Sequence, residues 1–412
     1  MTPSDLEFHP LLALAYASLI FAAACAASAL LVARNPALRE LAPQQRNRTG
    51  HLDGLRGVLA LGVFVHHSFT ARQYLLTGHW QWSSSPVLNQ LGQSTVALFF
   101  MITGYLFSNK LLNSRQAPID WWQLYESRIR RLTPIYLVCA AAVALSVAAL
   151  THFELRESRL SIAHELLDWA FFAIPGRPDI NAYPSTWTLM AGVNWSLRYE
   201  WIFYVCLPLL FWPLRFVASP KAARGAVGLL LAVLLRSIWH HHNLGHPNLY
   251  YVHFACGIGA ALILRDPVLS KITASKTFRI GALASLGGLL LMQSADNALA
   301  ASLGLIVFLS VANGASLFGL LKLGPVIWLG EVSYGIYLMH GLAIYWALTA
   351  LDGAGLLRGL GVVPYAGLMA GVAASVTALA SVSYVLLERP IMRWSWRRRD
   401  ARLPASLDAK QA

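Results

Sequence analysis

Charged residues are scarce in this sequence. Of its 412 residues only 12% are Asp, Glu, Lys or Arg, whereas 57% are hydrophobic. Soluble globular domains carry about 25% charged residues, so this composition excludes an ordinary water-soluble domain and indicates a protein whose solvent is the bilayer. Cysteine is scarce too. The four cysteines lie in apolar stretches without paired spacing, and we interpret them as small core residues.

Acidic residues are the rarer of the two charged kinds. The sequence has 19 Asp and Glu residues and 32 Lys and Arg residues, which gives a net charge of +13. In a soluble domain this excess would suggest nucleic acid as a partner. Here the basic residues lie in short loops between apolar runs, a pattern typical of cytoplasmic loops in membrane proteins. We therefore expect membrane lipids as partners and no nucleic acid.

The first apolar run, residues 11–32, lacks the basic residues that start a signal peptide. Asp5 and Glu7 precede it, with no Lys or Arg. A signal peptide also has a shorter apolar stretch, so we expect a retained membrane helix. We find no internal repeat or low-complexity tract, and we expect no second soluble domain.

Long apolar runs make up most of the sequence. A helix needs about 17–25 apolar residues to cross a bilayer, and about eleven runs approach that length. We therefore predict an all-α, polytopic transmembrane helical bundle of about eleven spans. The expected spans are residues 11–33, 53–71, 92–109, 132–151, 193–213, 225–241, 248–264, 279–295, 298–321, 326–349 and 362–387.

The distribution of Lys and Arg predicts the orientation of these spans. When alternate loops are assigned to opposite sides, one set, which includes the C-terminal tail, collects nearly all the basic residues. Because basic loops stay cytoplasmic, we predict the N-terminus outside and the C-terminus cytoplasmic. The other set holds only Arg72, Arg156, Arg159, Arg177 and Arg358.

We divide the chain into three parts. Residues 1–50 comprise an additional N-terminal transmembrane helix and a cytoplasmic linker, residues 51–396 a motif-bearing transmembrane domain, and residues 397–412 a cytoplasmic tail that we expect to be disordered. Residues 152–192 are the longest non-cytoplasmic segment and are rich in proline and aromatics. We expect them to form an interfacial or partly re-entrant cap.

Arg56 and His67 are candidate functional residues within one span. Eleven residues separate them, which on a helix is a rotation of about 20° beyond three turns and a rise of roughly 16 Å. They are therefore expected to share one face, with Arg56 near the cytoplasmic boundary and His67 past the middle of the membrane, facing the same interior channel. His66 points about 100° away. The alternative for His67 is a core histidine hydrogen-bonded to a neighbouring helix.

A second candidate group lies at the cytoplasmic entry of the fourth span. Arg128 and Arg131 are spaced to share a helix face, with Pro134 just inside the membrane. Guanidinium groups bind phosphates bidentately, so a phosphorylated carrier from the cytosol is a fitting ligand. The alternative is a plain cytoplasmic anchor. Three further arginines, Arg56, Arg198 and Arg236, fall at or within predicted spans and are functional candidates because intramembrane charge is costly.

Ser196 and Glu200 form a third candidate group. They are four residues apart, so they project together, and Glu200 lies in an otherwise apolar span. A carboxylate there has to be paired or protonated, which suits a group that orients a base or binds an acceptor. A structural pair with Arg198 or another arginine is the alternative.

The remaining polar segments have simpler interpretations. Ser333, Tyr337 and His340 line one helix face, where hydrogen bonds between helices are the simplest use. Residues 387–390, Leu-Glu-Arg-Pro, look like a helix terminator. The histidines within residues 240–246 lack a recognised ligand spacing, so we expect no metal.

Taken together, these segments resemble the membrane-bound acyltransferase-3 family, which acylates envelope and exported glycans, nodulation factors and some macrolides. The resemblance runs from about Leu52 to Pro390, with the motifs in family order. Matching residues are the Arg56 and His67 pair, Phe99-Phe100 with Thr103-Gly104-Tyr105, Arg128 and Arg131 with Pro134 and Tyr136, Trp195-Ser196-Leu197 with Glu200 and Phe203-Tyr204, Ser333-Tyr334 to His340, and Glu388-Arg389-Pro390. Thr103 departs from the serine usual in the family, and the first helix is additional to the family's ten spans.

The resemblance implies an O-acyltransferase of the bacterial inner membrane. It implies acyl-coenzyme A, most simply acetyl-CoA, as donor and a glycan or lipid-linked glycan as acceptor. Arg128, Arg131, Arg56 and Tyr136 would bind the coenzyme, and His67 would deprotonate the acceptor hydroxyl or carry the acyl group transiently, with Asp53 or Glu200 orienting its imidazole. Trp195, Ser196, Tyr337 and His340 would bind the acceptor or support the site.

Two other functions fit some of the same residues. An acyltransferase that modifies a small molecule such as a macrolide shares the chemistry and differs only in the acceptor. A transporter or flippase of glycan precursors would also carry intramembrane charges, but it would move substrate without consuming a donor.

Overall fold

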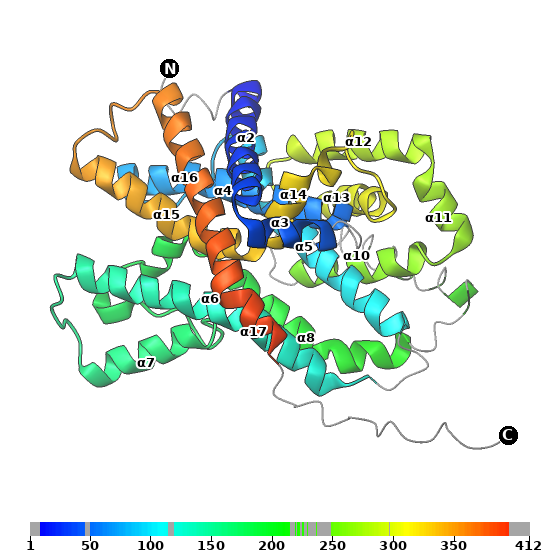
Figure 1. Ribbon diagram of the computed structural model, residues 1–412, viewed down its shortest axis with the longest axis horizontal. Helices are drawn as coiled ribbons and strands as arrows, with labels where there is room; N and C mark the ends of the chain where they lie inside the picture. The colour runs from blue at the N-terminus through cyan, green and yellow to red at the C-terminus, as the bar shows by residue number, and fades with distance from the viewer. Residues whose placement is uncertain are drawn as a thin grey trace.

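The structure, a computed structural model, describes residues 9–45, 50–113, 119–214, 249–295 and 297–394, with isolated residues between 219 and 236. Within these residues the chain is helical and contains no strand, which confirms the predicted all-α class (Figure 1). The elements are α2 (Pro10–Arg34), α3 (Pro36–Gln45), α4 (Gly50–Thr77), α5 (Pro86–Asn113), α6 (Trp121–Leu150), α7 (Arg159–Ala170), η1 (Ile180–Ala182), η2 (Thr186–Met190), α8 (Trp195–Leu214), α10 (Leu249–Ile263), α11 (Pro267–Ala274), α12 (Lys276–Leu290), α13 (Ala298–Ala312), η3 (Leu320–Lys322), α14 (Gly324–Glu331), α15 (Ser333–Gly353), α16 (Val362–Ser383), a π-helical turn (Tyr384–Glu388) and α17 (Arg389–Arg393).

Five helical segments of the described chain are long and apolar enough to cross a bilayer. A sixth qualifies if Tyr250–Ile263 and Pro267–Ala274, which meet at a bend of 106°, form one broken span. The expected spans at 53–71 and 193–213 coincide with α4 and α8, and those at 279–295 and 298–321 coincide with the 15-residue helices α12 and α13. The expected span at 225–241 and the tail lie outside the described residues. The five segments are Pro10–Arg34, Pro86–Asn113, Trp121–Leu150, Ser333–Gly353 and Val362–Arg393.

Helix α4 lies at the centre of the bundle and contacts α5, α14 and α15. Its crossing with α14 is unusually close. A Cβ atom on Gly330 would lie 1.8 Å from the carbonyl oxygen of Asp53, and one on Gly57 would lie 2.7 Å from that of Val326. Only glycine leaves room for this backbone contact, which holds the segment carrying Asp53 and Arg56 against α14.

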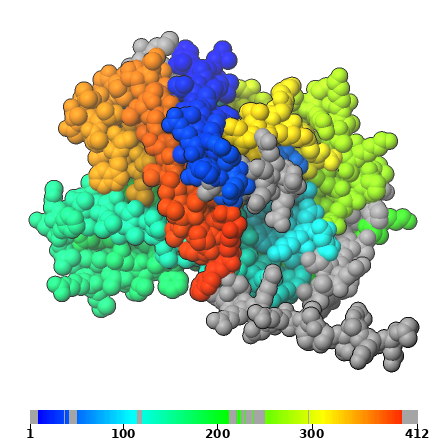
Figure 2. All heavy atoms as spheres, in the orientation of Figure 1, coloured from blue at the N-terminus to red at the C-terminus, as the bar shows by residue number. Residues whose placement is uncertain are grey.

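The N-terminal helix α2 is part of the bundle. It lies along α16, and Figure 2 shows the two side by side on one face. The hydroxyls of Tyr16 and Ser68 are 2.7 Å apart, and Ser28 donates a hydrogen bond to the Pro325 carbonyl at 3.0 Å. These bonds join α2 to α4 and to the start of α14.

The segment between α6 and α8 folds into a cap. Residues 152–192 contain α7, η1 and η2, so this segment is folded, while its position at the membrane surface stays a prediction. The backbone N–H of Asn181 donates to the Glu165 carboxylate at 2.9 Å, which ties η1 to α7. The cap reaches α15 at Gly341, where a Cβ atom would lie 2.3 Å from the Met190 carbonyl carbon. This close approach brings η2 next to His340. In Figure 1 the cap and α7 lie on the left, whereas the ends of α5 and α8 lie at the lower right.

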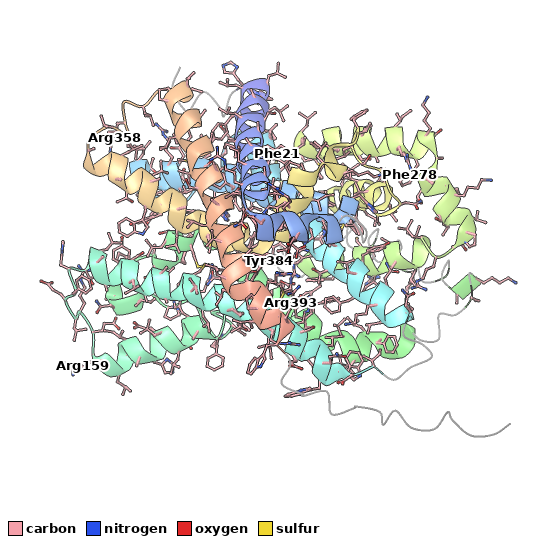
Figure 3. The ribbon with its side chains drawn as sticks, viewed as in Figure 1. Phe21, Arg159, Phe278, Arg358, Tyr384 and Arg393 are labelled. Atoms are coloured by element: carbon pink, nitrogen blue, oxygen red, sulfur yellow. The ribbon has the colours of Figure 1, made fainter. Side chains whose placement is uncertain are left out.

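Two predictions about the C-terminal third are wrong. The expected span 326–349 is two helices, because α14 ends at Glu331 and Val332 (φ −93°, ψ 10°) interrupts the helix before α15. The expected terminator at 387–390 does not end the last helix, which continues as α17 to Arg393. Pro390 is tolerated because it occupies the first turn after the π-helical turn, where its missing N–H removes no helical hydrogen bond. Figure 3 marks this path through Tyr384 to Arg393.

Candidate active site

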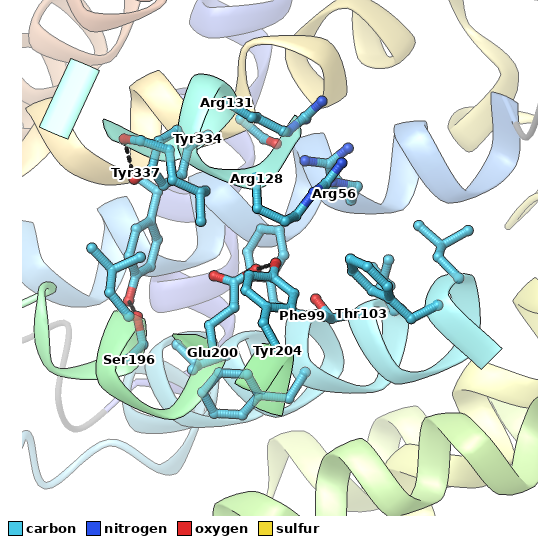
Figure 4. Close-up of a pocket in the computed structure, with 18 of the residues that line it drawn as sticks. Arg56, Phe99, Thr103, Arg128, Arg131, Ser196, Glu200, Tyr204, Tyr334 and Tyr337 are labelled. Carbon is cyan, nitrogen blue, oxygen red and sulfur yellow. Dashed lines mark hydrogen bonds between the residues drawn. The ribbon is translucent and has the colours of Figure 1, made fainter. Parts of the chain in front are cut away.

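A cavity of about 290 Å³ lies among α4, α5, α6, α8 and α15 (Figure 4). In Figure 4, Arg56, Arg128 and Arg131 gather on one side, and Ser196 and Tyr337 lie on the opposite side. The cavity therefore has a cationic end and an end lined by hydroxyl groups. The lining residues are Arg56, Val96, Phe99, Phe100, Ile102, Thr103, Leu106, Phe107, Lys110, Arg128, Arg131, Leu132, Ser196, Leu197, Glu200, Tyr204, Ser333, Tyr334 and Tyr337.

Helix α6 presents two of its three arginines to the cavity. Arg128 and Arg131 both line it, which confirms that they share a face. Arg130 points elsewhere: its Nε lies 3.6 Å from the Glu126 carboxylate, and its Nη1 donates to the Met392 carbonyl at 3.2 Å. Arg130 thus fixes α6 to α17, whereas Arg128 and Arg131 line the cavity.

Among the lining residues, four cations accompany one carboxylate, Glu200, while Glu331 and Glu388 act on Arg56 and Arg131 from outside the lining. Arg56 is paired with Asp53 at 3.9 Å, and Lys110 joins the arginines in the lining. The guanidinium of Arg128 lies 5.3 Å from the Phe107 ring centroid, and its buried Nε has no hydrogen-bond partner among the described residues. Because several guanidinium and ammonium groups line this end of the cavity, it suits an anionic ligand.

Helix α8 supplies the polar groups of the opposite wall. Ser196 and Glu200 both line the cavity, so the predicted common face is confirmed. The Ser196 hydroxyl lies 2.9 Å from that of Tyr337, which also donates to the Val193 carbonyl at 3.1 Å. Glu200 accepts a hydrogen bond from the Tyr204 hydroxyl. These bonds hold the Tyr337 ring across the inner end of the cavity.

His67 is hydrogen-bonded to a second histidine. Its Nδ1 lies 2.8 Å from Nε2 of His340, and the two rings stack with centroids 5.1 Å apart. His340 Nδ1 lies 3.0 Å from the Ile336 carbonyl, which can only accept, so Nδ1 carries the proton. With both rings neutral, His340 Nε2 accepts from His67 Nδ1–H. The lone pair of His67 is therefore on Nε2, the tautomer that a general base requires.

The open cavity stops short of His67. The expectation that Arg56 and His67 face one continuous channel is therefore wrong, since His67 is not among the lining residues. Aromatic rings occupy the intervening space: Phe99 and Tyr337 have centroids 6.2 Å apart, and the Tyr337 ring lies 6.1 Å from that of His340. Tyr337 thus separates the cation-lined cavity from the histidine pair.

Some of the residues proposed for the site lie elsewhere. Tyr136 is fully buried, and its hydroxyl donates to the Trp169 carbonyl at 2.7 Å. Trp195 packs on Tyr250 at 4.7 Å rather than lining the cavity. Asp53 precedes His67 by about 21 Å along α4 and pairs with Arg56, so it does not touch the imidazole. Arg198 is exposed, and the described contacts of Glu200 run to Tyr204 instead.

Three lining residues were given no role in the site from the sequence, although Tyr204 and Tyr334 belong to the segments that resemble the family. Tyr204 follows Glu200 by four residues, a spacing that places both on one helix face. Lys110 follows Thr103 by seven residues, or two turns, which is again one face. Tyr334 donates to the Leu132 carbonyl at 3.0 Å. Helical spacing from the recognised motifs was the available signal for the first two.

The described part of the chain contains no group of three or more His, Cys, Asp or Glu residues placed to hold a metal ion. The histidines of residues 240–246 lie outside the described residues.

An all-helical bundle with several apolar, membrane-length helices around a cation-lined cavity defines an integral membrane protein. Comparison with known families then specifies which kind of membrane protein it is. The chain belongs to the acyltransferase-3 family, whose "Acyltransferase domain" model matches residues 50–386. The protein is therefore an O-acyltransferase, as the sequence predicted, and α2 and α3 precede the matched region.

Individual relatives carry names consistent with this family. Exopolysaccharide production protein ExoZ of Rhizobium meliloti is 28% identical over 78% of this chain and 95% of its own length. Acyltransferase MdmB of Streptomyces mycarofaciens is 24% identical over 87% of this chain and 95% of its own length. Peptidoglycan O-acetyltransferase OatA of Listeria monocytogenes is 25% identical over 70% of this chain but only 48% of its own length. No solved structure matches the chain.

Proposed function

We propose that the protein transfers an acetyl group from acetyl-coenzyme A to a hydroxyl group of a cell-envelope or exported glycan in the bacterial inner membrane. The names of the relatives ExoZ and OatA support a polysaccharide acceptor.

The cation-lined end of the cavity carries this proposal. Coenzyme A bears several phosphate groups, and Arg128, Arg131, Arg56 and Lys110 supply matching charge. A volume of about 290 Å³ is at the lower end of small-molecule pockets, which span roughly 300–1,000 Å³. The narrow pantetheine arm would therefore enter the cavity, and the phosphates would stay among the cations at its mouth.

His67 would act as the general base. Its Nε2 takes the proton from the acceptor hydroxyl as the oxygen bonds to the acetyl carbonyl carbon. The carbon–sulfur bond breaks, and the departing thiolate takes the proton from the imidazolium. Asp53 would hold the Arg56 guanidinium, while Glu200 and Ser196 would position Tyr204 and Tyr337 around the thioester.

The thioester can reach His67 only if the Tyr337 ring turns aside. That movement breaks the hydrogen bonds of its hydroxyl with Ser196 and the Val193 carbonyl. In the closed arrangement the ring would keep water from the bound thioester and limit its hydrolysis.

The proposed membrane arrangement has eleven spans, with the N-terminus outside and the C-terminus cytoplasmic. It places Lys110, Arg128 and Arg131 near the cytosol, where coenzyme A is made, and the cap on the opposite side. A small-molecule acceptor is the alternative that shares the donor chemistry. Membership of an acyltransferase family argues against a transporter.

The test measures transfer of radiolabelled acetyl from acetyl-CoA by the purified protein in lipid nanodiscs. The acceptor is the host's envelope polysaccharide, de-esterified by mild alkali. We expect His67→Ala and His67→Asn to lower the rate by about 10²–10⁴-fold, the usual contribution of a general base. His67→Asn retains a donor at the Nδ1 position, so it removes the base while keeping the contact with His340.

Matched arginine variants test the donor site. Arg128→Gln should raise the KM for acetyl-CoA about tenfold or more, because one charge-assisted phosphate contact is lost. Arg198→Gln, on an exposed part of α8, should leave it unchanged. Wild-type rates in His67→Asn would refute the mechanism, and mass spectrometry of envelope glycans with and without the gene would identify the acceptor and the acyl group.

A further inference from the structure

An aromatic cluster lies on the side of His67 away from the cavity. The Trp80 ring is 6.0 Å from the His67 ring and 5.3 Å from the Trp187 ring, which it meets at 70°. The guanidinium of Arg177 lies 5.7 Å from the Trp187 ring centroid. Trp82, which is 64% exposed, lies 5.5 Å from His66 at the edge of the group. We call Trp80, Trp82, Trp187 and Arg177 the cap cluster.

The cap cluster lies beyond the end of α4 that is distant from Arg56, because Trp80 follows Thr77, which is about 32 Å along the helix from Arg56. Arg128 is near the start of α6, whereas the cap begins after Leu150, about 33 Å further along the same helix. His67 and His340 lie between the two, since Tyr337 contacts His340 on one side and Trp80 contacts His67 on the other. A donor and an acceptor arriving from opposite ends would meet at this histidine pair.

Backbone contacts hold the indoles of the cap cluster in place. Asn89 clamps the loop that carries Trp80 and Trp82, because its side chain accepts from the Ser83 N–H at 3.1 Å and donates to the Ser83 carbonyl. Gly192 (φ +65°) allows Trp187 to pack against the chain, since a Cβ atom there would lie 2.9 Å from the indole. The cap cluster is therefore preformed, which lowers the entropic cost of binding a ligand.

We propose that the cap cluster is the acceptor subsite and that it binds a pyranose ring of a glycan. This inference rests on the proposed function and specifies where its acceptor binds. The C–H face of a pyranose is apolar and packs on an indole, and its hydroxyl groups suit a nearby guanidinium. Trp80 and Trp187 are half-buried and meet at a steep angle, so together they form a corner for one sugar ring. Arg177 is exposed beside them and donates to sugar oxygens or to a carboxylate on the glycan.

The distances place an acceptor hydroxyl near the base. A sugar ring in van der Waals contact with Trp80 lies about 4 Å from the indole, and the His67 ring is 6.0 Å from the same indole. A hydroxyl on the edge of that sugar would then lie close to the His67 ring. The competing interpretation is that these aromatics only anchor the cap at the membrane surface, where Trp is common.

The experiment measures equilibrium binding of the de-esterified envelope polysaccharide to the purified full-length protein, by surface plasmon resonance and without acyl donor. We expect Trp187→Ala and Trp80→Ala to weaken binding about tenfold, and Trp187→Phe, which keeps an aromatic face, to stay within about threefold of wild type. Arg177→Gln, a change at an exposed side chain, should also weaken binding. Trp346→Ala is the matched control, because this partly exposed Trp on α15 lies outside the cap cluster.

Steady-state kinetics separate this subsite from the donor site. The KM for polysaccharide should rise in the Trp187 and Trp80 variants, while the KM for acetyl-CoA stays at the wild-type value. Wild-type protein that binds the polysaccharide but transfers no acetyl group would contradict the proposed donor and still support the subsite. Equal binding by wild type, Trp187→Ala and Trp80→Ala, or no binding by wild type, would overturn it and leave the cluster as a membrane-surface anchor.

Discussion

At the scale of single residues, His67 and His340 have different roles. Of the two, His67 keeps the ring nitrogen whose lone pair the pair's own hydrogen bonds do not use, namely Nε2, because His340 donates to the Ile336 carbonyl through Nδ1 and accepts from His67 through Nε2. His340 is thus a positioning residue that selects the reactive tautomer of its neighbour. Imidazoles held in this way by a second hydrogen-bonding group are common among metal ligands and bases.

His340→Leu should lower kcat about 10–100-fold with little change in the KM for either substrate, because the base is misoriented while both binding sites remain intact. His340→Gln should restore much of the rate, since the end of its amide lies near the position of Nε2 and can accept from His67. His253→Gln, a buried histidine of α10, serves as the control. A purely structural His340 would show a loss of folded protein rather than a fall in kcat, and no rescue by glutamine.

At the scale of secondary-structure elements, the sequence predicted which residues share a helix face better than it predicted which residues line one cavity. Helical periodicity correctly paired Arg128 with Arg131 and Ser196 with Glu200, because residues three or four apart on one helix always share a side. It could not predict that the cavity lined by Arg56 does not include His67, because the Tyr337 ring, which lines the cavity and lies 6.1 Å from His340, comes from another helix. The alternative interpretation of His67, a hydrogen bond to a neighbouring helix, is confirmed, but its partner His340 could not be predicted because the contact depends on how α4 and α15 pack.

The glycine crossing of α4 and α14 gives a prediction at this scale. Gly330→Ala should destabilise the protein by about 1–3 kcal/mol, because its Cβ atom would lie 1.8 Å from the Asp53 carbonyl oxygen and the helices have to separate. The apparent thermal midpoint in detergent should fall. Gly281→Ala on α12 has open space around the new methyl group and should be neutral. Equal midpoints for the two variants would show that the crossing is not close-packed.

At the scale of the whole molecule, the bundle has two chemically different ends. One end carries Arg128, Arg131 and Lys110, and the other carries the cap with its aromatic residues. The all-α class was predictable because composition and apolar run length decide it. The number of spans was harder to predict, since α12 and α13 are short and α10 and α11 meet at a bend of 106°.

Cysteine labelling tests the orientation of these two ends. In a background with the native cysteines replaced by alanine, Leu356→Cys, between α15 and α16, should react with a membrane-impermeant maleimide added to intact cells. Val268→Cys, on α11, should react only after permeabilisation. Both side chains are more than half exposed, at 57% and 55%, so accessibility does not limit the reaction. The reverse pattern would invert the proposed topology.

The ring of Tyr337 and the stacked imidazoles behind it have a consequence for the cell. If the reaction proceeds through them, only a two-carbon unit has to travel between compartments, and the nucleotide that delivered it never leaves. A glycan that has already been exported could then be acetylated with acetyl groups that are made in the cytosol. No pore wide enough to dissipate ion gradients would need to open.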